Sequence, residues 1–168
     1  MKIKHRSAIL LSGALWLAIG VMLLVKGMHY LIDAGNAALK GGPVSPYSPL
    51  SLIGRFSKNP QQSALILLSI SLILGLFKGR VMMKKAVVRI VKRVQTFENP
   101  FPIKKLYPPA YLLLIGGMMA MGMAFKYLPF PMDVKGFIDA AVGSALINGA
   151  MLYFRFAWAA TPKRGDYL

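Results

Sequence analysis

A few polar side chains lie within or at the ends of long apolar stretches, where they are the residues best placed to do chemistry. Asn148 is an amide near the middle of the last apolar stretch, and Ser144 lies one helical turn before it. Lys26 and Lys126 each close an apolar run, and Asp139 lies near the start of one. Charges inside a membrane mark ion or solute paths, whereas charges at its boundary can snorkel to the surface. These five residues are therefore our candidates for a polar path, with a Lys26–Asp139 or Lys126–Asp139 ion pair at its outer opening.

The same region also permits a purely structural interpretation. Small residues at three- and four-residue spacing let helix backbones approach closely, and an amide between them can hydrogen-bond across the contact. The last apolar stretch carries such a stripe, and the glycines of the preceding stretch or the serines of the second could face it. The stripe and its candidate partners are Ala141, Ser144, Ala145, Asn148 and Gly149, with Gly116, Gly117, Ser69 and Ser71. We therefore expect tight helix packing or a homodimer seam here as the alternative to a substrate-binding amide.

The segment from Lys78 to Phe97 has the most specific local pattern. At 100° per residue its apolar residues fall on one face and many of its basic residues on the opposite face. The apolar set is Met83, Val87, Ile90, Val91, Val94 and Phe97, and the basic residues of the segment are Lys78, Arg80, Lys84, Lys85, Arg89, Lys92 and Arg93. This pattern predicts a cationic amphipathic helix that lies in the membrane interface and binds anionic lipid headgroups. A simple topology anchor is the alternative.

The composition argues against catalysis and metal binding. The chain has no cysteine, two histidines and five acidic residues, so cysteine-ligated metals and carboxylate centres are not expected. No phosphate-binding glycine loop, zinc-binding helix motif or nucleophile elbow occurs. His29 and Asp33 lie one turn apart and could form a proton-sensitive pair, although an interfacial hydrogen bond of His29 would serve equally well. We expect no enzyme activity, no cofactor and no metal site.

Four uncharged or nearly uncharged runs must position these residues. They predict an all-α membrane protein, a single domain over residues 1–168. Its four transmembrane helices, in two hairpins, lie at 7–34, 60–78, 107–128 and 137–160, and the basic interfacial helix lies at 79–97. Asn59 and Pro60 mark the start of the second helix, and the proline-rich loop before them has room for a short helix.

Charge distribution predicts how the chain is threaded. Hydrophobic residues make up 56% of it, yet 21 lysines and arginines stand against five acidic residues, for a net charge of +16. With the N-terminus in the cytoplasm, fifteen of the 21 basic residues fall on the inner side. Basic residues favour the cytoplasmic side, so we expect an integral protein of a bacterial inner (plasma) membrane with both termini cytoplasmic.

Two classes of function fit these features. The first is a small transporter or channel for an anionic or amphiphilic solute, acting as a homo-oligomer because four helices enclose little volume. The second is a non-catalytic accessory subunit or lipid-surface organiser that uses the basic segment 78–97. The expected partner is a bilayer with anionic lipid headgroups rather than nucleic acid, because nucleic-acid modules need a soluble fold with a basic face. The residues identify no partner protein.

Overall fold

The described part of the chain is a bundle of three long helices. The computed structural model describes residues 2–42, 45–46, 48–96, 101–102, 113, 117, 120 and 127–158. The long helices are α1 (His5–Leu39), α3 (Pro60–Gln95) and α5 (Met132–Trp158), and a short helix α2 (Pro49–Gly54) lies in the first connection. A two-residue strand β1 (Lys2–Ile3) pairs antiparallel with β2 (Phe101–Pro102). The expectation of an all-α architecture is confirmed.

The end of α1 is determined by two consecutive glycines. Gly41 has a positive φ of 76°, a conformation that glycine adopts without steric cost. Its N–H donates to the carbonyl of Ala38 (3.2 Å), and the N–H of Gly42 donates to that of Ala37 (2.9 Å). These two bonds form a Schellman cap, which satisfies carbonyls that the helix itself leaves without a donor. The helix therefore continues well past residue 34, where the sequence predicted its end.

Helix α3 differs most from the sequence prediction. It begins as expected, with Asn59 at the N-cap and Pro60 at the first helical position. We expected it to end near residue 78 and to be followed by a separate interfacial helix, but the structure has one continuous helix from Pro60 to Gln95. Gly79 does not interrupt it, because this glycine is buried against α5 and its lack of a side chain is used for packing.

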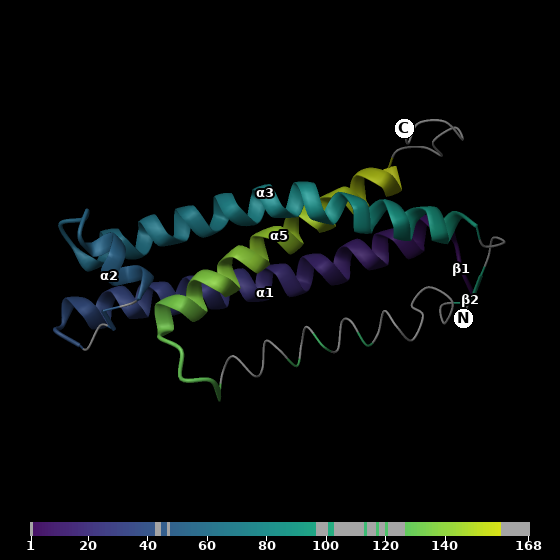
Figure 1. The fold of residues 1–168 in the computed structure, drawn as a ribbon. Coiled ribbons are helices and arrows are strands. Elements are labelled where there is room, and N and C mark those ends of the chain that lie inside the picture. The colour runs from purple at the N-terminus through teal and green to yellow at the C-terminus, as the bar shows by residue number, and fades with distance from the viewer. Residues whose placement is uncertain are drawn as a thin grey trace.

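The three long helices lie side by side, and α5 packs against both α1 and α3 (Figure 1). Helix α5 is antiparallel to α1, since Gly20 contacts Gly143 while Gly27 contacts Gly136. The start of α1, the end of α3 and the end of α5 therefore lie at one end of the bundle, which we call the basic end. Helix α2 lies at the opposite end (Figure 1).

Two hydrophobic clusters hold the helices together. The cluster at the basic end joins α1, α3 and α5 through Ala8, Ile9, Trp16, Val87, Val91, Val94, Leu146, Ala150, Tyr153 and Ala157. The cluster at the opposite end joins α1, α2 and α3 through Leu31, Ala34, Leu50, Ala64 and Leu67. Here Asp133, only 3% exposed, accepts a hydrogen bond from the backbone N–H of Leu50 (2.9 Å) and so ties α2 to the start of α5.

Three helices of the described chain are long and apolar enough to cross a membrane: α1, residues 60–94 of α3, and α5. A helix of about 20 residues spans the hydrocarbon core, and each of these exceeds that length. The predicted third span, residues 107–128, lies almost entirely outside the described residues. Of its described positions, Leu113, Gly117, Ala120 and Tyr127 are helical, and Leu128 lies in a bend.

Glycines bring the backbones of α1 and α5 into direct contact. A Cβ atom on Gly143 would lie 2.6 Å from the nitrogen of Leu24 and 2.7 Å from the carbonyl oxygen of Gly20. A Cβ on Gly136 would lie 2.9 Å from the carbonyl oxygen of Gly27. Such separations are too short for a methyl group, so this seam requires glycine on both helices.

We expect Gly143→Ala to lower the thermal unfolding temperature in detergent. Alanine normally stabilises a helix relative to glycine by up to about 1 kcal/mol. Here the added methyl group must push α1 and α5 apart, which should cost about 1–3 kcal/mol net. Gly54→Ala is the matched control, since its Cβ would meet no atom closer than Ser63 Oγ at 4.0 Å. Equal unfolding temperatures for Gly143→Ala and wild type, followed by circular dichroism, would contradict the seam.

Candidate functional site

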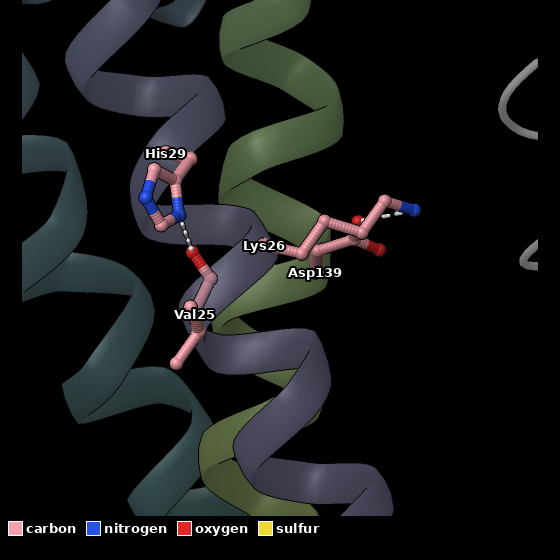
Figure 2. Close-up of polar contacts among 4 residues, drawn as sticks. All are labelled: Val25, Lys26, His29 and Asp139. Atoms are coloured by element: carbon pink, nitrogen blue, oxygen red, sulfur yellow. Dashed lines mark hydrogen bonds and ion pairs between the residues drawn. The ribbon is translucent and has the colours of Figure 1, made fainter.

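The structure brings together one of the ion pairs that the sequence suggested. Lys26 Nζ on α1 lies 3.3 Å from Asp139 Oδ2 on α5. The Lys26 side chain is 39% exposed and that of Asp139 15% exposed. The ammonium also lies 5.4 Å from the ring centroid of Tyr30, a distance that allows a cation–π contact. The pair points away from α3 (Figure 2), so it lies on an outer face of the bundle.

The glycine seam explains why these two residues meet. Gly27 directly follows Lys26, and a Cβ on it would lie 2.8 Å from the carbonyl oxygen of Gly136. Ala140, next to Asp139, is completely buried beside Gly27. The close approach therefore fixes the axial register of α1 against α5 and places the two charges opposite each other.

His29 makes a local contact. Its Nδ1 lies 2.8 Å from the carbonyl oxygen of Val25, one turn earlier on α1 (Figure 2), so Nδ1–H is the donor. The structure thus directs this ring atom to the backbone of its own helix rather than to Asp33. Of the two interpretations of His29, the geometry agrees with the hydrogen bond.

The hydrogen bond between helices comes from Ser144 and not from Asn148, to which the sequence assigned it. We expected the Asn148 amide to bond across the helix contact, but its Nδ2 donates to the carbonyl oxygen of Ser144 on the same helix (2.8 Å). The bond between helices comes from Ser144, whose Oγ donates to the Leu72 carbonyl oxygen of α3 (3.2 Å). Ser71 of α3, a candidate partner, donates instead to Leu68 of its own helix (2.7 Å).

The small-residue stripe of α5 lies against α3. A Cβ on Gly75 would lie 2.6 Å from Cβ of Ser144, and one on Gly79 would lie 2.8 Å from the Ala145 carbonyl oxygen. The backbone of Ala141 also contacts Gly75, and Gly149 lies against the side chain of Met83. Moving along α3 from Gly75 to Met83, the contacted residues of α5 advance from Ser144 to Gly149, so the two helices run parallel. Ala141, Ala145 and Gly149 are thus at a helix contact, and Gly117 is an exposed helical position.

All seven basic residues from Lys78 to Arg93 are exposed on α3, and we call them the basic stripe. Its members are Lys78, Arg80, Lys84, Lys85, Arg89, Lys92 and Arg93. On the other face of the same segment, Val87, Val91 and Val94 are at most 2% exposed and pack against α1 and α5. The sequence identified this apolar face correctly but assigned it to lipid. This face is covered by protein, because α3 continues as one helix alongside α1 and α5 instead of turning into the plane of the membrane.

Several residues important to the arrangement were missed by the sequence analysis. Gly13, Gly20 and Gly27 recur every seven residues in α1, and Gly136, Gly143 and Ala150 recur every seven in α5. The same seven-residue spacing of small residues in both helices was the signal from which their contact could have been predicted. Asp133, which binds the N–H of Leu50, gave none, because its partner lies 83 residues away in the sequence. Lys126 and Gly116 lie outside the described residues.

The described residues form no site of familiar chemistry. Within the part of the chain that the structure describes, no three histidine, aspartate or glutamate side chains are grouped so that they could hold a metal ion. What the arrangement offers is a partly exposed ion pair at one level and a row of exposed cations along α3 at another.

We expect the Lys26–Asp139 pair to contribute about 1–2 kcal/mol, between the values for exposed and buried pairs. Lys26→Leu and Asp139→Leu should each lower the unfolding temperature, because each leaves the other charge unpaired. The double variant should lose less stability than the two single losses added together. Strictly additive losses in a double-mutant cycle would show that the two charges do not interact.

Comparison with known proteins yields no relative of this chain: no protein-family model, curated protein or solved structure matches it.

Proposed function

We propose that the chain is a non-catalytic integral membrane protein that binds anionic lipid headgroups through its basic stripe. The observation that carries this proposal is the stripe itself: seven exposed cations along about 22 Å of α3, five of which share the face opposite Val87 and Val91. Those five are Lys78, Lys85, Arg89, Lys92 and Arg93. The valines on the opposite face anchor the segment to α1 and α5, so the charges are presented on a rigid surface. Such a surface suits a lipid-surface organiser or an accessory subunit.

The charge distribution supports a membrane orientation. The basic end of the bundle contains the start of α1, the end of α3 and the end of α5, and it holds most of the described basic residues. Under the positive-inside rule this end faces the cytoplasm. We therefore place both termini on the cytoplasmic side of a bacterial inner (plasma) membrane, with residues 107–128 as a fourth span.

Lipid is a better partner than nucleic acid for this surface. The stripe belongs to a helix whose other segment, residues 64–77, is uncharged and exposes large apolar side chains such as Ile73 and Phe77. A membrane would cover that segment and bring the stripe next to lipid phosphates. Each Lys or Arg near an anionic membrane surface adds about 1 kcal/mol of attraction.

Transport is the second candidate, and the Lys26–Asp139 pair is the observation that favours it. A charged pair near the membrane boundary could open and close an outer entrance, as the sequence suggested, with a homo-oligomer supplying the path. Against it, Ser144 and Asn148 donate hydrogen bonds to backbone carbonyls at close helix contacts. A solute path would need these polar groups to line an open space instead.

Neutralising part of the stripe should weaken binding to anionic lipid. In nanodiscs that mix phosphatidylglycerol and phosphatidylcholine, we expect wild type to enrich phosphatidylglycerol around itself. Lys84→Gln, Lys85→Gln and Arg89→Gln combined should lose up to about 3 kcal/mol, on the order of a hundredfold in the binding constant. Native mass spectrometry of the retained lipids measures this.

The matched control removes three exposed basic residues from the opposite end: Lys40→Gln, Arg55→Gln and Lys58→Gln. This variant has the same net charge as the stripe variant, and we expect it to retain the enrichment. If both variants lose phosphatidylglycerol equally, net charge and not the stripe is responsible, and the proposal is wrong.

Flux measurements separate the two candidates. In liposomes loaded with a panel of small ions and metabolites, we expect wild type and Asn148→Leu to leak no faster than protein-free liposomes. A flux that requires the protein and is lost in Asn148→Leu would favour transport instead.

A further inference from the structure

The basic stripe lies at a particular position along the long axis of the bundle, which we call its level, and this level determines which part of the membrane the stripe meets. Helix contacts define this level. Gly79 of α3 lies beside Ala145 and Asn148 of α5, and Met83 lies beside Gly149. In turn, Gly20 of α1 lies beside Ile147 of α5. The stripe therefore runs alongside α5 from about residue 145 onward and alongside the first half of α1.

At this level the bundle has two different faces. Residues 7–25 of α1 and 140–154 of α5 contain no charged residue. They expose apolar side chains there, among them Leu11 and Leu15 on α1 and Met151 on α5. At the same level α3 exposes its lysines and arginines. Apart from Arg155, which is exposed on α5 at about the level of Leu11, the bundle is thus apolar on the α1 and α5 side and cationic on the α3 side at this level.

The charges of α1 and α5 indicate where the hydrocarbon lies. Their described acidic residues, Asp33 on α1 and Asp133 and Asp139 on α5, all lie toward the end opposite the stripe. Residues 7–25 of α1 form an uncharged stretch of about 28 Å, which matches the hydrocarbon core. Residues 140–154 of α5 lie alongside residues 13–27 of α1, since Ala140 contacts Gly27 and Phe154 contacts Gly13. The uncharged stretches of these two helices therefore overlap over most of their length.

The uncharged run of α3 lies at a different level from the uncharged runs of α1 and α5. Its uncharged run, residues 59–77, is centred about 12 residues, or roughly 18 Å, farther toward the α2 end than residues 7–25 of α1. A flat bilayer that covers α1 and α5 would therefore immerse much of the stripe in hydrocarbon. Sliding α3 along its axis to remove the offset would break the contacts of Gly75 and Gly79 with α5 and uncover Val87, Val91 and Val94.

We infer that the bilayer is locally thinned along α3, with anionic headgroups of the cytoplasmic leaflet drawn along the basic stripe to a depth that is hydrocarbon beside α1. This inference rests on the proposed lipid binding and extends it from a surface contact to a deformation of the membrane. Phosphate groups beside each Lys and Arg neutralise the stripe and hydrate it. The uncharged run of α3 is as long as that of α1, but much of it lies beyond the core that α1 and α5 define, so its apolar part within that core is short. Thinning of the bilayer around a helix accommodates such a mismatch.

Two single-cysteine variants test this directly, because the chain has no cysteine of its own. Val81 on α3 is 55% exposed and Leu15 on α1 is 38% exposed, and the helix contacts place them at nearly the same level. Each variant, Val81→Cys or Leu15→Cys, receives a nitroxide spin label in phosphatidylglycerol-containing liposomes. Collisions with a water-soluble nickel complex and with membrane-soluble oxygen report the surroundings of each label.

We expect the label at position 81 to collide with the nickel complex several-fold more often than the label at position 15, and the label at 15 to favour oxygen. Equal exposure of both labels to the nickel complex would show that this end projects into the cytoplasm. Equal preference for oxygen would place the stripe in undeformed hydrocarbon. Either result would overturn the thinning, while the lipid enrichment measured in nanodiscs would stand or fall separately.

The composition of the liposomes tests the headgroups. In pure phosphatidylcholine the difference between the two labels should shrink several-fold, because neutral headgroups are drawn less strongly to the stripe. An unchanged difference would mean that water alone occupies this face, which would overturn the part of the inference that concerns anionic lipid.

Discussion

The backbone contact between α1 and α5 is the constraint on which the other features depend. Where Gly20 meets Gly143 and Gly27 meets Gly136, no side chain separates the two helices. Close backbone approach through small residues is a common way to associate helices in lipid, where the hydrophobic effect offers little between apolar surfaces. This contact fixes the register that opposes Lys26 to Asp139. It also leaves the other face of α5 free to receive Gly75 and Gly79 of α3, and this second contact sets the level of α3.

These helix contacts place the basic residues of α3 at a level where burying them in hydrocarbon would cost free energy. A lysine or arginine at the centre of a bilayer costs about 2.5–3.5 kcal/mol on insertion scales, so several of them would cost on the order of 10 kcal/mol. This is comparable with the whole net stability of a domain, about 5–15 kcal/mol. Thinning a bilayer costs fractions of a kcal/mol for each Å, which adds up to several kcal/mol over an offset of roughly 18 Å. Deforming the lipid is therefore cheaper than immersing the stripe, and neutralising it with anionic headgroups reduces the cost further.

The sequence predicted the elements better than their relationships. Hydrophobic runs and helix-start signals at Asn59 and Pro60 gave the long helices, because composition and capping are local properties. The periodicity of 78–97 identified the buried valines, but it could not say whether lipid or protein would cover them, since both are apolar. The Lys26–Asp139 pair was one of two candidates, and only the axial register selects it. Contacts over long separations, such as Asp133 with Leu50, have no local signature at all.

The internal contacts of the bundle also limit where a function can lie. Helix α5 uses one small-residue face for α1 and another for α3, and the hydroxyl and amide groups on it donate to backbone carbonyls. In hydrocarbon an unpaired polar group is costly, so these bonds stabilise a closed packing rather than an open path. A substitution that opened a path between the described helices would have to break both the backbone contacts and the hydrogen bonds. The exposed charges of the basic stripe meet neither obstacle, because they already face outward. A ligand can therefore reach these charges without any change of the fold, whereas a path between the described helices would require one.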